Sequence, residues 1–262
     1  MRKLRLLDSY DILIKKMDNT FIFKELDIEG KQTLEVISDA QRFNQWMYSV
    51  TSKHLTGNIL EIGSGIGNIS EHYLNDGRNL MLSDIRQNYC IYLEQKFAQT
   101  PSCTGVRLLD LVHPNFDIEY LDLLGSFDGI FALNVVEHIL DDVLAIANAK
   151  KLLRKSGRLV ILVPAYPTLF NDFDRNLDHY RRYTEGGLRG AFEKNNLQIV
   201  HSQYFNLAAI AGWWFSGTVL KNRTIPTGQM KIYDMLVPIF KIIDKLVFNR
   251  AGISVIVEGI KI

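Results

Sequence analysis

Residues 58–68 read Asn-Ile-Leu-Glu-Ile-Gly-Ser-Gly-Ile-Gly-Asn, a short β-rich run that passes into three closely spaced glycines. Apolar residues then recur at helical spacing, at Ile69, Tyr73 and Leu74, until Gly77 ends the pattern. Glycines between a strand and a helix let the backbone turn tightly and approach a ligand. The N-terminus of the following helix offers unpaired N–H groups to a polar or anionic group. The stretch therefore predicts a strand, a ligand-binding loop and a helix.

The same alternation continues along the rest of the chain. Further β-rich runs lie at 79–84, 105–110, 127–134, 158–163, 197–200 and 253–257. Helical patterns separate most of them, and strands that alternate with helices predict a parallel sheet covered by helices on both faces. The residues before the first strand have mixed helical periodicity and predict an N-terminal helical cap.

One predicted helix, between the strands at 127–134 and 158–163, is especially well marked. Its apolar stripe consists of Ile139, Leu140, Val143, Leu144 and Ala147. Its expected last turns carry the basic residues Lys150, Lys151, Arg154 and Lys155. Gly157 follows as the expected C-cap, and cations near a helix C-terminus are favourable, so the helix is predicted to include Lys155.

The 262-residue chain has the composition of an ordinary globular protein, with 47% hydrophobic and 23% charged residues. This composition excludes intrinsic disorder and collagen-like or coiled-coil structure. Thirty basic and 29 acidic side chains leave a formal net charge of +1, which argues against nucleic acid as a partner because its binders need a basic surplus. Two cysteines, no signal-peptide pattern and no spanning segment predict a reducing, cytoplasmic location.

An acidic residue, Asp84, ends the second predicted strand, 21 positions after Gly63. This spacing suits a carboxylate that accepts hydrogen bonds from both hydroxyls of a ribose. Nicotinamide and flavin enzymes use the pattern G-x-G-x-x-G/A, whereas here the third glycine is Gly67 and Asn68 follows it. The spacing disfavours a nicotinamide-dependent oxidoreductase, which stays an alternative beside a non-catalytic nucleotide-binding module.

Preceded by Glu61, the loop resembles the E/D-x-G-x-G-x-G motif of class I S-adenosylmethionine-dependent methyltransferases. Asp110 ends the third predicted strand and Asn134 ends the fourth, where that family contacts the adenine and the methionine end of its cofactor. The resemblance thus implies S-adenosylmethionine as the cofactor. The residues it implies as contacts are Glu61, Gly63, Ser64, Gly65, Gly67, Asn68, Asp84, Ile85, Asp110, Leu111, Asn134 and Val135.

Further segments extend the resemblance over most of the chain. Residues 127–142, 163–167, 178–184 and 252–257 resemble a bacterial methyltransferase group often encoded beside glycosyltransferases of polysaccharide or lipid-linked sugar biosynthesis. The resemblance implies a Rossmann-like α/β fold with a seven-stranded, mostly parallel sheet, helices on both faces, an antiparallel last strand and a helical lid. The expected organisation is a helical cap over 1–56, a cofactor-binding core over 57–202, a helical insertion or lid over 203–250 and the final strand over 251–262.

Methyl transfer from a sulfonium is an in-line displacement, so the protein mainly supplies alignment and a dry, shaped pocket. Where the acceptor is a hydroxyl, a base matched to neutral pH helps, and His179 is the first candidate with His138 the second. Both lie near the carboxyl ends of predicted strands, where doubly wound sheets bind ligands. A structural hydrogen bond or a role in starting a helix is the alternative for them, and Tyr180 is a third catalytic candidate.

The expected acceptor-binding residues are Tyr166, Arg181, Arg182, Tyr183, Trp213 and Trp214. The two arginines suit bidentate recognition of a phosphate or carboxylate, or they pair internally with Asp174 and Asp178. The two tryptophans lie in the long insertion, where they either pack in the core or form an apolar wall over the acceptor.

A metal site is weighed at Glu137, His138, Asp141 and Asp142, because hard cations bind carboxylates. Acidic residues at this spacing equally oppose the positive N-terminal end of a helix. The family resembled is not metal-dependent, so no metal is expected.

Residues 233–248 predict an apolar helix with a narrow charged face and a kink at Pro238. Such a helix packs on the domain, forms a homodimer or lies on a bilayer surface. Together these observations predict methyl transfer from S-adenosylmethionine to a small-molecule or lipid-linked acceptor. Oxygen is favoured as the methylated atom, with nitrogen and carbon as alternatives.

Overall fold

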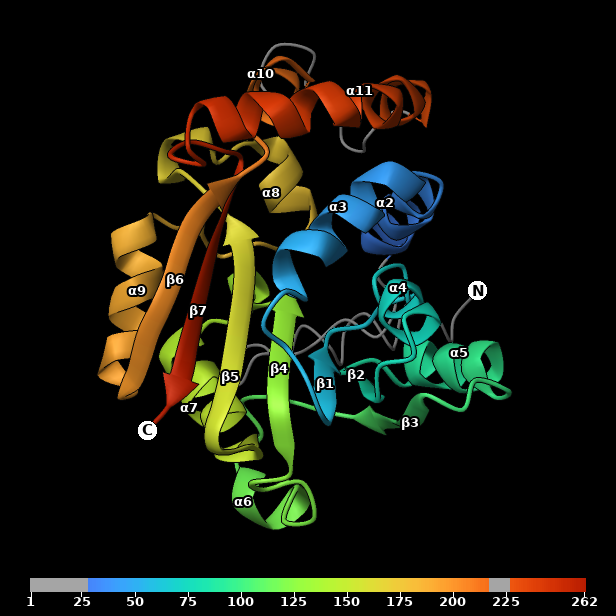
Figure 1. The fold of residues 1–262 in the computed structure, drawn as a ribbon, viewed down its shortest axis with the longest axis vertical. Helices are drawn as coiled ribbons and strands as arrows, with labels where there is room; N and C mark the ends of the chain where they lie inside the picture. Colours follow the sequence, from blue (N-terminus) through green and yellow to red (C-terminus); the bar gives the residue numbers. More distant parts are fainter. Residues whose placement is uncertain (1–27, 217–226) are drawn as a thin grey trace, which may run out of the picture.

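The computed structural model describes residues 28–216 and 227–262, which form one seven-stranded sheet (Figure 1). The strand order is β3-β2-β1-β4-β5-β7-β6. Strands β1 to β5 are parallel, whereas β7 is antiparallel to both β5 and β6. This confirms the expected Rossmann-like class. The strands are β1 Ile59–Ile62, β2 Leu80–Asp84, β3 Cys103–Leu108, β4 Phe127–Leu133, β5 Leu153–Pro164, β6 Leu197–Phe205 and β7 Ser254–Lys261.

Helices precede the first strand and separate the strands from one another. They are α2 Ile28–Ser38, α3 Gln41–Thr51, α4 Ser70–Asn75, α5 Gln87–Phe97, α6 Phe116–Glu119, α7 Asp142–Leu152, α8 Asp172–Asn176, α9 Glu185–Lys194, α10 Ala209–Trp214 and α11 Thr227–Leu246. Among the described residues, η1 Val136–His138 and η2 Pro167–Leu169 are 3₁₀ turns. The part of the expected helical cap at 1–27 lies outside the described residues.

Apolar side chains alternate along the strands and form one core on each face of the sheet. On one face, Leu60, Ile62 and Ile130 belong to a cluster with residues of α7 and α9. On the other face, Ile59 and Phe131 belong to a cluster with residues of α3, α4 and α5. Because successive side chains of a strand point to opposite faces, the sheet is buried on both sides only when helices cover both.

Helix α7 ends earlier than the sequence pattern predicted. It stops at Leu152, and Arg154 and Lys155 lie in the first residues of β5. Leu153 is fully buried and pairs with a residue of β4. Burial of Leu153 in the sheet outweighs the helical preference of the basic run. The predictions that the helix includes Lys155 and that Gly157 caps it were therefore wrong.

Helices α2, α3, α10 and α11 gather beyond the carboxyl ends of the parallel strands (Figure 1). Helix α11 packs on α3, where the carboxylate of Asp234 accepts a hydrogen bond from the backbone N–H of Phe43 at 2.8 Å. Val237 of α11 is fully buried in the same core cluster as Trp46 of α3. One face of the 233–248 segment thus packs on the domain. Among the described residues, no helix has the length and apolar character needed to span a bilayer.

Candidate active site

The loop between β1 and α4 follows the carboxyl end of β1 and so lies at that edge of the sheet. Because β1 lies between β2 and β4, the ends of these two strands are its neighbours. Its glycines Gly63, Gly65 and Gly67 have φ values of 72°, 55° and 80°. Most side chains are strained at such angles, so the turn favours glycine at all three positions. The N–H of Ser64 donates to the carbonyl of Ser83 at 2.8 Å, which holds the loop against β2.

Gly63 also lies against the segment that follows β4. A Cβ atom at Gly63 would lie 2.4 Å from Cγ2 of Val135, far inside contact distance. The next residue toward β4, Asn134, is exposed and has a φ of 54°. The absence of a side chain at Gly63 therefore brings the loop and the end of β4 together.

Asp84 joins the loop to the end of β2. One carboxylate oxygen accepts a hydrogen bond from the N–H of Gly65 and the other from the N–H of Arg86, both at 2.9 Å. The side chain is almost fully buried, and burial raises its pKa against these hydrogen bonds, which lower it. The carboxylate that the sequence assigned to a ribose thus also organises the glycine loop.

Glu61 lies beneath the loop and is buried. Its carboxylate accepts a hydrogen bond from the hydroxyl of Ser70 at the start of α4. Burial raises the pKa of Glu61 to about 7, although hydrogen bonds from Ser70 and Ser64 oppose the shift. Glu61 therefore supports the loop from within the core.

The other expected cofactor residues differ in exposure. Asp110 is half-buried, and its carboxylate accepts a hydrogen bond from the N–H of Val112 at 2.8 Å. Leu111 is buried, whereas Ile85 is half-buried. The side-chain amide of Asn68 donates to a carbonyl of α2 at 2.9 Å, so Asn68 connects the loop to the N-terminal helices.

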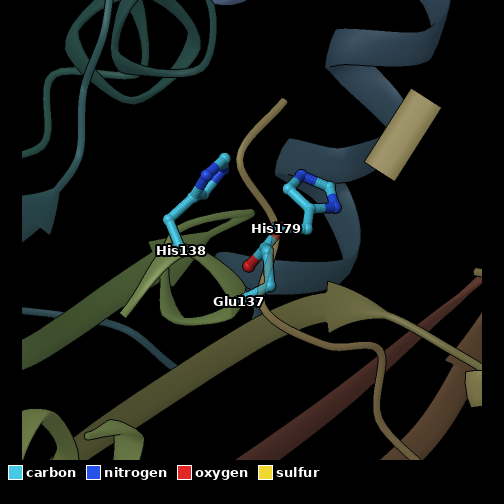
Figure 2. A group of neighbouring side chains, drawn as sticks. All are labelled: Glu137, His138 and His179. Atoms are coloured by element: carbon cyan, nitrogen blue, oxygen red, sulfur yellow. The ribbon is translucent and has the colours of Figure 1, made fainter. Parts of the chain in front are cut away.

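Three titratable side chains meet beyond the end of β4: Glu137 and His138 from η1, and His179 from the segment after α8 (Figure 2). Each offers one oxygen or nitrogen atom, and these three atoms lie within 4.8 Å of one another. The two imidazole rings meet edge to face, with centroids 4.6 Å apart. The sequence had named all three residues without placing His179 beside Glu137.

Burial governs the charges in this cluster. It raises the pKa of Glu137 to about 7 and lowers the pKa of His138 to about 3. The charges of His179 and Arg86 lower the pKa of His138 further. His138 is thus neutral at pH 7 and a weak proton acceptor, which argues against its expected role as a base.

His179 is held by a buried ion pair. Its Nδ1 lies 2.9 Å from a carboxylate oxygen of Asp174, and Nε of Arg182 donates to both oxygens of the same carboxylate at 2.8 and 2.9 Å. Asp174 also closes a capping box with Asn171 at the start of α8. The guanidinium of Arg182 is buried in this internal pair, the alternative that the sequence left open, and is not exposed to an acceptor.

The remaining acceptor candidates are divided between internal contacts and the surface. Arg181 pairs with Asp142 at 2.9 Å, and the hydroxyl of Tyr183 donates to the same carboxylate at 2.8 Å. The ring of Trp213 lies under the guanidinium of Arg182, 4.6 Å from it. Tyr166 stacks on a neighbouring ring of β6, while Tyr180 and Trp214 are exposed.

Sequence reasoning missed Asp174 as the partner of His179. The signal that could have found it is their spacing of five residues, which lets the turn after a short helix bring the two side chains together. It also missed Arg86, whose N–H holds Asp84 and whose charge acts on His138.

The sheet order, the glycine loop and the polar strand ends define a class I S-adenosylmethionine-dependent methyltransferase domain. Over residues 32–202 the sequence matches the family described as methyltransferase domain, and the chain belongs to that family. No curated protein matches the sequence.

Solved structures with this fold cover most of the chain. Phosphoethanolamine N-methyltransferase 2 of Haemonchus contortus, in complex with S-adenosylmethionine, has a TM-score of 0.60 and 16% identity, covering 92% of this chain and 60% of that one. The chain thus spans 60% of the length of that enzyme. A methyltransferase of Archaeoglobus fulgidus has a TM-score of 0.54 and 17% identity, covering 86% of this chain and 94% of that one.

Geranyl diphosphate C-methyltransferase of Streptomyces coelicolor A3(2), in complex with Mg²⁺, geranyl diphosphate and S-adenosylhomocysteine, has a TM-score of 0.59 and 12% identity. The match covers 94% of this chain and 86% of that one. At these identities the likenesses show the fold. With the family match, they establish S-adenosylmethionine as the cofactor of the domain.

The close approach of Gly63 to Val135 predicts that Gly63→Ala weakens binding of S-adenosylhomocysteine by about 10–100-fold, since overpacking typically costs about 1–3 kcal/mol. The matched control is Gly77→Ala, because Gly77 has a φ of 69° and a Cβ there would meet nothing within 4 Å. Both variants carry the same backbone strain. Calorimetric titration showing equal affinities for the two variants would contradict the assignment.

The buried carboxyl of Glu61 predicts a pH-dependent stability difference. Between about pH 4.5, the ordinary value, and about 7, the folded chain holds a proton at Glu61 that the unfolded chain has lost. This contribution of Glu61 makes folding less favourable as pH rises through that window. As pH rises from 4.5 to 8, the free energy of unfolding of Glu61→Gln should therefore increase relative to that of the natural protein, by up to about 3 kcal/mol. Urea unfolding at several pH values checks this, with exposed Glu71→Gln as control; parallel profiles would refute it.

Proposed function

We propose that this protein transfers a methyl group from S-adenosylmethionine to an oxygen atom of a small-molecule or lipid-linked acceptor. The observation that carries the proposal is the arrangement of the strand ends, where the loop after β1 lies between Asp84 of β2 and Asn134 after β4. Doubly wound sheets bind their ligands in the crevice at this edge.

The residues at this edge fit the cofactor. The carboxylate of Asp84 uses two of its roughly four acceptor positions for backbone N–H groups, and the others suit ribose hydroxyls. Asp110 and Leu111 would lie along the adenine, and Asn134 along the methionine end. When bound, the cofactor supplies a methyl carbon that its positively charged sulfur makes electrophilic.

The chain's own contribution is alignment and the exclusion of water around the acceptor. The cluster of Glu137, His138 and His179 follows β4 directly, so an acceptor held beside it would lie next to the end of the cofactor nearest Asn134. A cluster of imidazole and carboxylate groups suits a hydroxyl, which must lose a proton, better than a free amine, which need not. This supports oxygen as the methylated atom.

A stripe on α11 supports a lipid-linked acceptor. Ile232, Met235, Ile239, Ile242 and Leu246 recur every three or four residues, and each is more than half exposed. The stripe lies on the side of the helix opposite the buried Val237. An apolar stripe of this length is typical of helices that lie in a membrane surface.

The charges around the stripe favour an anionic surface. Lys231, Lys245 and Arg250 are exposed. The acidic residues of the same helix turn inward: Asp234 accepts from Phe43, and Asp244 is buried and accepts from two backbone N–H groups. The outward charge of α11 is therefore positive, as in helices that bind anionic lipid headgroups. The resemblance to methyltransferases often encoded beside glycosyltransferases of polysaccharide or lipid-linked sugar biosynthesis supports the same acceptor class.

The proposal predicts that S-adenosylmethionine with a labelled methyl group, incubated with the protein and a total bacterial extract, labels material that partitions into organic solvent. The label should resist the conditions that hydrolyse esters, as an ether does, and S-adenosylhomocysteine should form in equal amount. Gly63→Ala should lose both products, and Gly77→Ala should keep them. Label confined to the aqueous phase would refute a lipid-linked acceptor, and absence of any affinity for S-adenosylhomocysteine would refute the function.

The stripe on α11 predicts that the protein floats with vesicles containing phosphatidylglycerol and less with vesicles of phosphatidylcholine alone. Ile239→Glu should weaken the binding by more than about tenfold, since it removes one buried apolar side chain and adds a charge of the lipids' sign. Ile118→Glu is the control, because Ile118 is the same residue type and is also exposed, on α6 at the other end of the molecule (Figure 1). Sedimentation that shows a stable dimer broken by Ile239→Glu, without flotation, would assign the stripe to self-association.

A further inference from the structure

Glu137 is a fully buried carboxylate with no partner for either oxygen among the residues that the structure describes. Buried polar groups are almost always hydrogen-bonded, and a buried charge requires a counter-charge or a metal ion. Glu61, equally buried, accepts a hydrogen bond from Ser70. The isolation of Glu137 is therefore specific to its position beside His138 and His179, not general to carboxylates in this core.

The ring of His138 lies beside the backbone of Leu177 and Asp178. The imidazole of His179 is oriented through one of its nitrogens, since Nδ1 is engaged by Asp174 at 2.9 Å. Nε2 of His179 thus remains for another ligand. Metal-binding histidines typically have this arrangement, in which a carboxylate or a backbone carbonyl accepts from the second ring nitrogen and fixes the tautomer.

We propose that Glu137, His138 and His179 bind a divalent transition-metal ion, for which Zn²⁺ is the best fit. Two imidazoles and one carboxylate, with one position left for an outside ligand, form a typical catalytic zinc site. Bond lengths of about 2.0–2.2 Å place tetrahedral ligands roughly 3.4 Å apart. The three donor atoms here lie within 4.8 Å of one another, so binding requires each pair of them to approach by at most about 1.4 Å.

The donor set selects the class of metal. Mg²⁺ and Ca²⁺ prefer oxygen ligands, whereas imidazole suits Zn²⁺, Fe²⁺ and their neighbours. Asp174 and Arg182 form an ion pair behind His179 and neutralise each other's charge. The positive charge of a metal ion would therefore be balanced by the carboxylate of Glu137.

The carboxylates weighed from the sequence do not take part. Asp141 accepts from the N–H of Leu144 as the N-cap of α7, and Asp142 pairs with Arg181 and Tyr183. Both residues lie at the N-terminal end of α7, as the alternative interpretation of the sequence held. His179, distant in sequence, takes their place beside Glu137 and His138. The expectation that no metal binds is revised on this geometry.

The role of the ion rests on the proposed function, although metal binding itself does not. The open coordination position would take an oxygen of the acceptor, next to the crevice between the ends of β1, β2 and β4. Arg86, two residues after Asp84, acts electrostatically on His138, so the cluster lies near the end of β2. A metal-bound oxygen is held in place and is more easily deprotonated than a free hydroxyl.

The test is calorimetric titration of the full chain, purified without a histidine tag and stripped with a chelator, with Zn²⁺, Mn²⁺ and Mg²⁺ salts. We expect one equivalent of Zn²⁺ to bind, and Mg²⁺ to bind far more weakly. Glu137→Gln and His179→Gln should each weaken Zn²⁺ binding by more than about 100-fold, because loss of an outer partner alone typically costs about 10–100-fold. His201→Gln, at an exposed histidine on β6, is the matched control and should bind as the natural protein does.

Cobalt identifies the ligands independently of the variants. Co²⁺ at the proposed site should give visible absorption bands without a thiolate charge-transfer band. Such a band would place the ion at Cys90 or Cys103 and overturn the proposal. Zn²⁺ affinity that is undetectable at micromolar concentrations, or equal in the natural protein and both variants, would overturn it as well. If Glu137→Gln fails to fold by circular dichroism, His179→Gln and the cobalt spectrum decide.

Titration of the stripped protein with S-adenosylhomocysteine separates this proposal from the proposed function. Affinity for S-adenosylhomocysteine without affinity for Zn²⁺ overturns the metal site and leaves methyl transfer in place. Affinity for Zn²⁺ without affinity for S-adenosylhomocysteine supports the metal site and overturns the function.

Discussion

The hydrogen bond from the N–H of Gly65 to the carboxylate of Asp84, at 2.9 Å, is the contact on which the geometry of the site depends. It fixes the loop after β1 to the end of β2. The same loop lies against Val135 because Gly63 has no side chain, which fixes it to the end of β4. The ends of β1, β2 and β4 are thus held together by the carboxylate of Asp84 and by the close packing that Gly63 allows. Since interiors are densely packed, these contacts fix the positions of the three strand ends relative to one another.

Burial raises the pKa of three of the carboxylates buried at this edge, those of Glu61, Asp84 and Glu137. Asp84 and Glu61 accept hydrogen bonds and thereby hold the loop and the start of α4. Glu137 accepts none within the described part of the chain. Buried groups of this kind destabilise the fold, so their concentration where the strands end favours function over stability as the reason for them. Asp84 and Glu61 thus support the loop, whereas Glu137 has no such structural partner among the described residues.

The sequence predicts the fold well because the strand and helix periods and the glycine turn are local features. The seven strands and the glycine loop after the first of them follow from these features, whereas the antiparallel last strand was expected only from the family resemblance. The end of α7 could not be predicted, because it depends on burial of Leu153 against β4, which the local pattern does not contain. The contact of His179 with Glu137 was equally out of reach, since it depends on how the segment after α8 folds back over η1. Periodicity locates elements, whereas contacts between distant loops require the tertiary structure.

The internal pairing of Arg182 gains a reason from its neighbours. Its guanidinium holds Asp174, which holds His179, and the ring of Trp213 from α10 lies against its face. An arginine that bound an acceptor phosphate would have to leave Asp174, and removal of one partner from a buried ion pair is strongly unfavourable. The chain Trp213–Arg182–Asp174–His179 instead connects the helices beyond the sheet to the cluster after β4. Arg182 therefore fixes the orientation of His179 through Asp174.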